Sequence, residues 1–144
     1  MIELPAIKPL PFYDGDSLRK WQLIEDWHFQ FDNIKVFIPK GFITDFASIP
    51  VGLRSLYDPT GYLLIASIFH DYCYQYAGYL EIFDGFDKPF FVGVERFRAD
   101  LMFRRIAHIT HPSKEIATNA AHKALRLGGG SAWDECREKE KDAT

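Results

Sequence analysis

The pattern of apolar and polar positions predicts a short antiparallel sheet near the start of the chain. Residues 27–31 and 34–38 are rich in aromatic and β-branched side chains, which favour strands. Asp32-Asn33 between them is a two-residue link whose side chains tolerate the positive φ of a tight hairpin. We therefore expect an N-terminal hairpin, with residues 21–24 as a candidate third strand.

Helical periodicity replaces this pattern in the second half of the chain. The first predicted helix is apolar on nearly every side, so it should lie at the centre of the fold. Gly78, Pro112 and Gly128 stand where helices are expected to stop. The predicted helices cover residues 60–77, 94–109 and 113–127. Together with the hairpin they predict an α+β fold, a single domain over residues 1–144 in which a small antiparallel sheet packs with three main helices.

Four other stretches read as irregular. Residues 1–17 contain three prolines and predict an extended arm with few backbone donors to offer a sheet. Residues 41–50 are loop-like, with polar residues between apolar ones. The aromatic stretch 79–93 is interpreted as either a surface-crossing insertion or a short hairpin. Residues 136–144 are rich in charges and predict a frayed tail.

Composition narrows the possible function classes. The 144 residues are 47% hydrophobic and 26% charged, which is typical of a soluble globular domain. A formal net charge of −3 provides no overall positive field, so general binding to nucleic acids or to anionic membranes is not expected. The N-terminal residues lack the apolar run of a signal peptide, and no apolar stretch is long enough to span a membrane.

The most informative polar residues are His70 and Asp71, in the middle of the first predicted helix. Successive helical residues point about 100° apart, so the two side chains face different neighbours. Burying them without partners would cost several kcal/mol in order of magnitude, so each needs a partner. Two interpretations stay open: a structural hydrogen-bond network, or a metal or catalytic site built from imidazole and carboxylate.

Three further residues are candidates for the same site. Asp45 and Ser48 lie in the segment Thr-Asp-Phe-Ala-Ser, where they either close a local turn or face the first helix. Asp100 has Arg96 and Arg104 four residues away on either side, the spacing of helical ion pairs. Its helix is otherwise largely apolar, so we expect it at the edge of the core, facing the first helix. Several carboxylates placed together need a cation, a proton or an arginine among them.

Taken together, these motifs resemble one known family. The resemblance rests on four segments: Ile38 to Pro50, His70-Asp71-Tyr72-Cys73-Tyr74, Arg98 to Phe103, and Ala124-Leu125-Arg126-Leu127-Gly128-Gly129 with Trp133. Their order and spacing are similar to those of the domain-of-unknown-function 1353 family of tailed-phage and prophage proteins. The chain departs from the family pattern in the aromatic stretch 79–93 and at His122, where the family has a tyrosine. The resemblance implies a phage origin and a small one-domain fold, and it brings no established activity.

Three functions are compatible with these residues. The first is a small metal-dependent hydrolase, with Asp45, His70 and Asp100 holding Zn, Mn or Mg and with Asp71 and Ser48 as the catalytic residues. The second is a non-catalytic virion or assembly protein whose polar cluster only fixes the loop against the helices. The third is an inhibitor of a host protein. A virion or host partner would bind the aromatic segment 79–93. Any of these places the protein in the host cytoplasm or in the virion.

Overall fold

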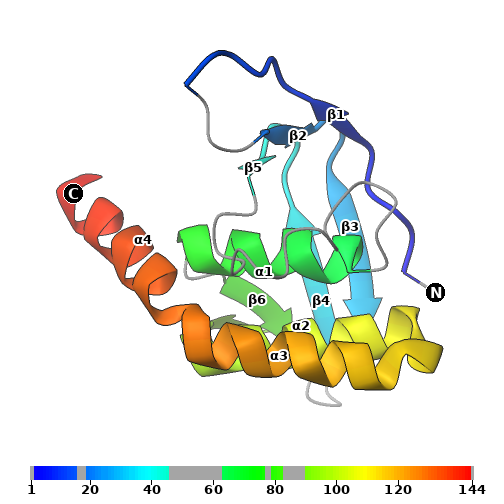
Figure 1. The fold of residues 1–144 in the computed structure, drawn as a ribbon. Helices are drawn as coiled ribbons and strands as arrows, with labels where there is room; N and C mark the ends of the chain where they lie inside the picture. The colour runs from blue at the N-terminus through cyan, green and yellow to red at the C-terminus, as the bar shows by residue number, and fades with distance from the viewer. Residues whose placement is uncertain (1, 16–18, 46–62, 77–78, 83–89, 144) are drawn as a thin grey trace.

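The computed structural model describes residues 2–15, 19–45, 63–76, 79–82 and 90–143. Its strands and helices follow one another along the chain as drawn in Figure 1. The strands are β1 (Ile7–Pro9), β2 (Trp21–Leu23), β3 (Trp27–Phe31), β4 (Ile34–Ile38), β5 (Ile43–Thr44), β6 (Tyr79–Ile82) and β7 (Phe90–Gly93). The helices are α1 (Leu64–Tyr76), α2 (Arg96–Thr110), the 3-10 turn η2 (Pro112–Lys114), α3 (Glu115–Gly128) and α4 (Gly130–Ala143). This is the predicted α+β fold.

The predicted hairpin is present and forms part of a four-stranded antiparallel sheet. Strands β3 and β4 pair with Phe29 opposite Val36, and the sheet order is β3-β4-β6-β7. Alternate residues of β3 are buried, as a half-buried strand requires. Asp32 in the turn has a φ of 51°, which confirms the reason for expecting Asp-Asn there. The Arg105 guanidinium on α2 donates two hydrogen bonds to the Asp32 carboxylate, at 2.9 and 3.0 Å, and so ties the turn to the helices.

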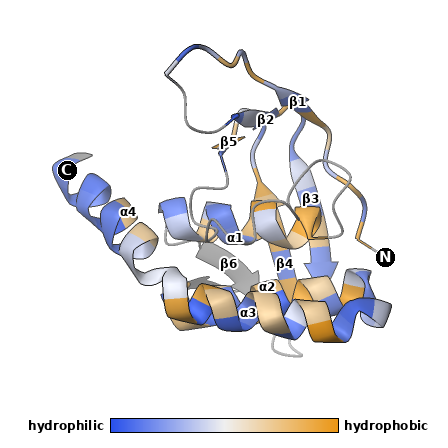
Figure 2. Ribbon diagram, in the orientation of Figure 1, coloured by the Kyte–Doolittle hydropathy of each residue, from blue (hydrophilic) through white to orange (hydrophobic). Residues whose placement is uncertain are grey.

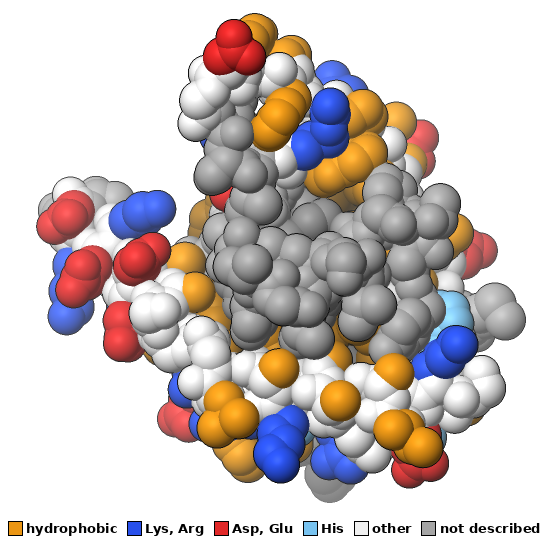
Figure 3. Space-filling model, viewed as in Figure 1, with side chains coloured by type: hydrophobic (Ala, Val, Ile, Leu, Met, Phe, Trp, Pro, Cys, Tyr) orange, Lys and Arg blue, Asp and Glu red, His pale blue; other side chains and the backbone are white. Residues whose placement is uncertain are grey.

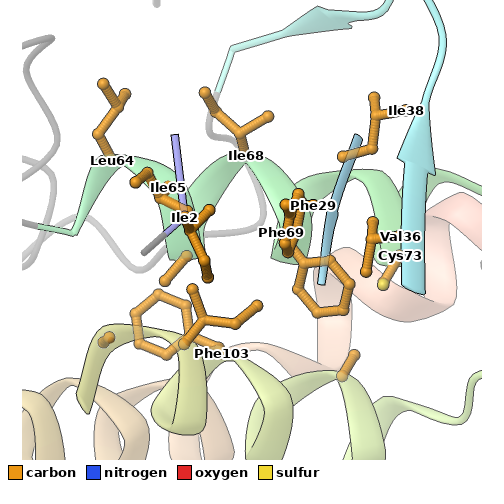
Figure 4. Close-up of a cluster of buried hydrophobic side chains, with 14 of the residues drawn as sticks. Ile2, Phe29, Val36, Ile38, Leu64, Ile65, Ile68, Phe69, Cys73 and Phe103 are labelled. Atoms are coloured by element: carbon orange, nitrogen blue, oxygen red, sulfur yellow. The ribbon is translucent and has the colours of Figure 1, made fainter. Parts of the chain in front are cut away.

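Helix α1 lies at the centre of the fold, as its apolar pattern predicts. It packs against α2 on one side and against α4 near its C-terminal end, and α2 packs in turn against α3 (Figure 1). The Phe69 ring on α1 makes edge contacts with Phe29 and Phe31 of β3, at centroid distances of 6.1 and 6.0 Å. Figure 4 shows side chains of α1, β3, β4 and α2 meeting in this core, with Phe103 on the α2 side. The core therefore holds α1 between the sheet and the other helices.

The structure differs from the sequence interpretation at both ends of the chain. Three residues of the predicted N-terminal arm form β1, which pairs with β2, and β5 completes this second antiparallel sheet in the order β1-β2-β5. The prolines do not prevent this pairing, because within β1 a proline stands only at the last position.

The aromatic stretch forms the hairpin β6–β7, and residues 83–89 lie outside the described residues.

The segment expected to be a frayed tail belongs to helix α4. Its outward positions are charged, and Figure 2 shows the helix as mostly hydrophilic. Its inner positions hold Ala132, Trp133 and Cys136, which pack against the core. The Arg137 guanidinium lies over the Trp133 ring, 4.3 Å from its centroid, and donates a hydrogen bond to the Tyr74 carbonyl of α1. These contacts hold the first turns of α4 against α1 and the core. No helix within the described ranges is long and apolar enough to cross a membrane.

The turn between α3 and α4 is closely packed at Gly129. Its backbone N–H donates to the Leu125 carbonyl, which closes the C-terminal end of α3. A Cβ atom at Gly129 would lie 2.7 Å from the Leu125 carbonyl oxygen and 2.8 Å from the Tyr74 hydroxyl. The absence of a side chain at this position therefore lets the turn rest on Tyr74 of α1.

This packing predicts opposite outcomes at two adjacent glycines. Gly129→Ala forces the Tyr74 hydroxyl or the turn to move, so we expect a loss of about 1–3 kcal/mol in the free energy of unfolding. Gly130→Ala is the matched control, because the nearest atom of the described residues would lie 3.7 Å from its Cβ and because alanine would begin α4 with a better helix former. Urea unfolding of both variants gives the comparison. Equal stabilities for the two variants would contradict the packing at Gly129.

Candidate functional site

The candidate site begins with two polar residues on the buried helix α1. His70 has no solvent-exposed surface and Asp71 retains 2%. Their side chains point to different neighbours, as the helical geometry predicts. His70 faces α2, and Asp71 faces β5. The two adjacent residues therefore belong to two separate sets of contacts.

The first set centres on the Asp100 carboxylate of α2, which is fully buried. Its Oδ1 atom lies 2.6 Å from Nε2 of His70 and accepts a hydrogen bond of 2.8 Å from the Tyr74 hydroxyl. Its Oδ2 atom accepts a hydrogen bond of 2.7 Å from Nη1 of Arg126 on α3. The Arg96 Nε atom is 3.9 Å from Oδ2. One carboxylate thus joins α1, α2 and α3, and we call Asp100, His70, Tyr74, Arg96 and Arg126 the Asp100 network.

The surroundings fix the protonation states in this network. Burial is the largest influence on His70 and lowers its pKa below 6.5, although the hydrogen bond to Asp100 opposes the shift. Burial alone would raise the pKa of Asp100, but the hydrogen bonds from His70, Tyr74 and Arg126 outweigh it and hold the pKa below its usual value. Burial and the nearby Asp100 charge raise the pKa of Tyr74 far above its usual range. At neutral pH the network therefore contains an ionised Asp100, a neutral His70 and a neutral Tyr74.

Arginines in and beside the network also close helix ends. The Arg96 Nη2 atom donates hydrogen bonds of 2.9 Å to the Leu125 and Arg126 carbonyls, two of the last carbonyls of α3. Its Nε atom donates to the Tyr74 hydroxyl at 3.2 Å. Arg137 on α4 does the same for α1 through the Tyr74 carbonyl. A cation at a helix C-terminus interacts favourably with the helix dipole and with the last carbonyls, so these contacts attach the end of α3 to α2 and the end of α1 to α4.

The second set of contacts attaches strand β5 to α1. The Thr44 hydroxyl donates a hydrogen bond to Oδ2 of Asp71. The Gln75 amide donates to the same oxygen at 2.9 Å and to the Ile43 carbonyl at 3.3 Å. The Asp71 carboxylate therefore accepts a hydrogen bond from Thr44, which immediately precedes Asp45.

The predicted site residues are brought together in part. His70 and Asp100 form a direct pair, and Asp100 faces α1 as expected. Of its two predicted arginine neighbours, Arg96 is in the network, whereas the Arg104 Nε atom donates to Asn119 of α3. Asp45 is half-buried immediately after β5.

The other roles expected of the site residues stay predictions. Ser48 lies outside the described residues, so its catalytic role and that of Asp71 are open. Among the residues that the structure describes, no group of three or more His, Cys, Asp or Glu side chains could hold a metal ion. The assignment of Asp45, His70 and Asp100 as metal ligands is therefore a prediction that the described geometry does not strengthen.

The sequence did not assign Tyr74 and Arg126 to the Asp100 network, and it indicated only part of the role of Arg96. Tyr74 lies one helical turn after His70, so its position on the same stripe was a usable signal. Arg126 looks like an ordinary surface residue of an amphipathic helix, and its partner lies 26 residues away. Arg96 reads as half of a local ion pair, although its strongest contacts are with the end of α3.

The fold and the network define a small α+β protein whose helices meet on one buried carboxylate. The family model described as "Protein of unknown function (DUF1353)" matches residues 21–124, so the chain belongs to that family. The matched region contains His70, Asp71, Tyr74 and Asp100, and Arg126 follows just after it. Neither the curated proteins nor the solved structures contain a match to this chain.

The histidine and aspartate pKa shifts predict that the fold loses stability in acid. The pKa of His70 is 6.5 in the unfolded chain and lower in the folded one. At a pH between the two pKa values, the unfolded chain therefore binds a proton that the folded chain does not. The contribution of Asp100 is present above its unfolded pKa of 3.8 and is lost as the pH falls through its lower folded value. Both effects have the same sign, so the free energy of unfolding should fall as the pH is lowered from about 7 to 5 and further below.

Urea unfolding across this pH range checks the prediction. His122 also has a lowered pKa, first because of burial and then because of Arg104, so it contributes to the same slope. In His122→Asn, the slope that remains belongs to His70. In this variant, a free energy of unfolding that stays constant or rises as the pH is lowered from about 7 to 5 would contradict a neutral, buried His70.

Proposed function

We propose that this chain is a non-catalytic phage virion or assembly protein in which the Asp100 network serves to hold the helices together. The observation that carries the proposal is the state of the Asp100 carboxylate. It has no exposed surface, and both of its oxygen atoms accept hydrogen bonds from side chains of the protein. This is the arrangement of a buried charge that has been fully compensated.

The positions of the partners support a structural role. A general acid or base has to come within hydrogen-bond reach of its substrate. His70 is as fully buried as Asp100, and its Nε2 atom is occupied by that carboxylate. Arg96 donates its hydrogen bonds to the Tyr74 hydroxyl and to carbonyls at the end of α3. The network therefore uses its hydrogen-bonding capacity on other parts of the same chain, which favours conformational specificity as its purpose.

The phage setting of the proposal derives from the resemblance of the motifs to tailed-phage and prophage proteins. A virion or assembly protein acts through its surface, and several large apolar side chains of this chain are exposed, among them Ile116 at 89% and Leu127 at 81%. The segment 79–93 stays a second candidate for contacts with a virion or host partner. In this proposal the protein resides in the host cytoplasm before assembly, or in the virion afterwards.

A hydrolase is the second candidate, and one observation favours it. A neutral imidazole hydrogen-bonded to an ionised carboxylate, here His70 and Asp100 at 2.6 Å, is the pairing that acid–base catalysis uses. In that function Asp100 would orient His70, and His70 would move a proton to or from the substrate. Inhibition of a host protein has no comparable observation among the described residues.

The structural role predicts a large loss of stability when the network loses its charge. Asp100→Asn leaves Arg126 without its anion and removes an acceptor from His70 or Tyr74, so we expect a loss of about 3–5 kcal/mol in the free energy of unfolding. Asp32→Asn is the matched control, because the Asp32–Arg105 pair has the same chemistry on the exposed surface. Its effect should be small. Similar losses for the two variants would contradict the proposal.

Two variants of the network, Asp100→Asn and His70→Gln, separate the two candidate functions when they are tested in a phage that encodes the protein. The measurement is the yield of infectious particles at a temperature where circular dichroism shows that Asp100→Asn or His70→Gln remains folded. A structural network predicts that each folded variant supports normal yield and that yield falls only when the fold melts. A variant that is folded but supports no particles would contradict the structural role and favour the hydrolase.

A further inference from the structure

The outer face of α3 has a pattern that the Asp100 network does not explain. The helix buries Thr118, Ala121 and Leu125 on its inner side. On the opposite side, four exposed residues follow one another at spacings of four, three and four. They are Ile116, Ala120, Lys123 and Leu127, and we call this set the seam of α3. This alternation of threes and fours is the spacing of a coiled-coil seam, whose members lie in one line along a helix.

Two of these residues are large, aliphatic and almost fully exposed. Ile116 retains 89% of its accessible surface and Leu127 retains 81%, the two highest values among the large apolar residues described. They stand one at each end of α3, about 16 Å apart at 1.5 Å per residue. Figure 3 shows hydrophobic side chains spaced along the face of the molecule that α3 forms. This face resembles half of a helix–helix contact.

We propose that α3 pairs with α3 of a second copy of this chain, with the two helices antiparallel. The seam is symmetric about its midpoint between residues 121 and 122, as a two-fold contact requires. In this register Ile116 faces Leu127 of the other copy, and Ala120 faces Lys123. The long stem of Lys123 thus lies against the smallest side chain of the seam. A parallel pair would instead place Lys123 against Lys123, with like charges in contact.

Charge at the two ends of α3 favours the same orientation. Glu115 lies in the first turn of the helix and Arg126 in the last. In the antiparallel pair the end of α3 that contains Glu115 lies beside the end of the other copy's α3 that contains Arg126, and the two helix dipoles run in opposite directions. The flank of the seam opposite Arg126 contains Ala117 and Ala124, both half-buried, so the helices can approach closely there.

Helix α2 can extend the contact beyond α3. Phe97 and Leu101 are exposed by 55% and 37% and lie one helical turn apart. The Arg126 guanidinium lies over the Phe97 ring at 5.2 Å from its centroid, so Phe97 is next to the end of α3 that contains Leu127. The α2–α3 pairs of two copies would then form a four-helix arrangement, a common way to bury such seams.

Sedimentation analysis of the full chain over a range of concentrations tests the proposal. We expect a monomer–dimer equilibrium in the native protein. Ile116→Lys and Leu127→Lys should each weaken the dimer by about tenfold or more, because each places a charge opposite an apolar anchor. Their melting curves, measured where the protein is monomeric, should remain close to that of the native protein. Leu4→Lys is the control at a residue 70% exposed outside α3, and it should leave the dimer unchanged.

Disulfide trapping tests the register. In a Cys136→Ser background, the antiparallel pair predicts that Ile116→Cys protein forms a cross-link with Leu127→Cys protein when the two are mixed. Neither variant should cross-link to itself, because identical positions lie at opposite ends of the pair. A strictly monomeric native protein, a dimer that Ile116→Lys and Leu127→Lys leave intact, or efficient cross-linking of Ile116→Cys to itself would each overturn the proposal. None of these results bears on the role of the Asp100 network.

Discussion

The fold depends on one buried negative charge that has to be neutralised from three directions. Asp100 sits on α2, which packs against both α1 and α3, and it has no access to water. A carboxylate in such a place is costly unless donors surround it, and those donors come from different helices. His70 and Tyr74 must therefore approach from α1 and Arg126 from α3. A packing that moved these donors away from Asp100 would leave the charge without a partner, so the network favours the observed arrangement of the helices.

The same logic explains the crowded region where α1, α3 and α4 end or begin. Tyr74 donates to Asp100 through its hydroxyl, accepts from Arg96 and lies against Gly129. Its ring meets Trp133 of α4 edge-on at 5.1 Å. One side chain thus connects the buried charge to the α3–α4 turn. These contacts of Tyr74 explain why the segment His-Asp-Tyr-Cys-Tyr occurs in one sequence together with Leu-Gly-Gly and a following tryptophan.

The sequence predicts those parts of the fold that depend on local pattern and on the cost of burial. The β3–β4 hairpin follows from alternation and from Asp32 in its turn, and His70, Asp71 and Asp100 stand out because polar groups are costly on apolar helices. The partners Arg126 and Thr44 could not be assigned, because nothing local distinguishes an arginine or threonine that points inward from one that points to water. Helix α4 was missed because the glycines before it suggest an end, and its two anchors, Trp133 and Arg137, act through contacts with α1 that only the folded chain brings together.

The central claim is that the charges of the Asp100 network stabilise the fold by acting on one another. A double-mutant cycle on Asp100 and Arg126 measures this most directly, with urea unfolding of the native protein, Asp100→Asn, Arg126→Met and the double variant. We predict that the double variant is more stable than the sum of the single losses implies, with a coupling of about 1–3 kcal/mol. Losses that simply add would show that the two residues act independently and would contradict the account.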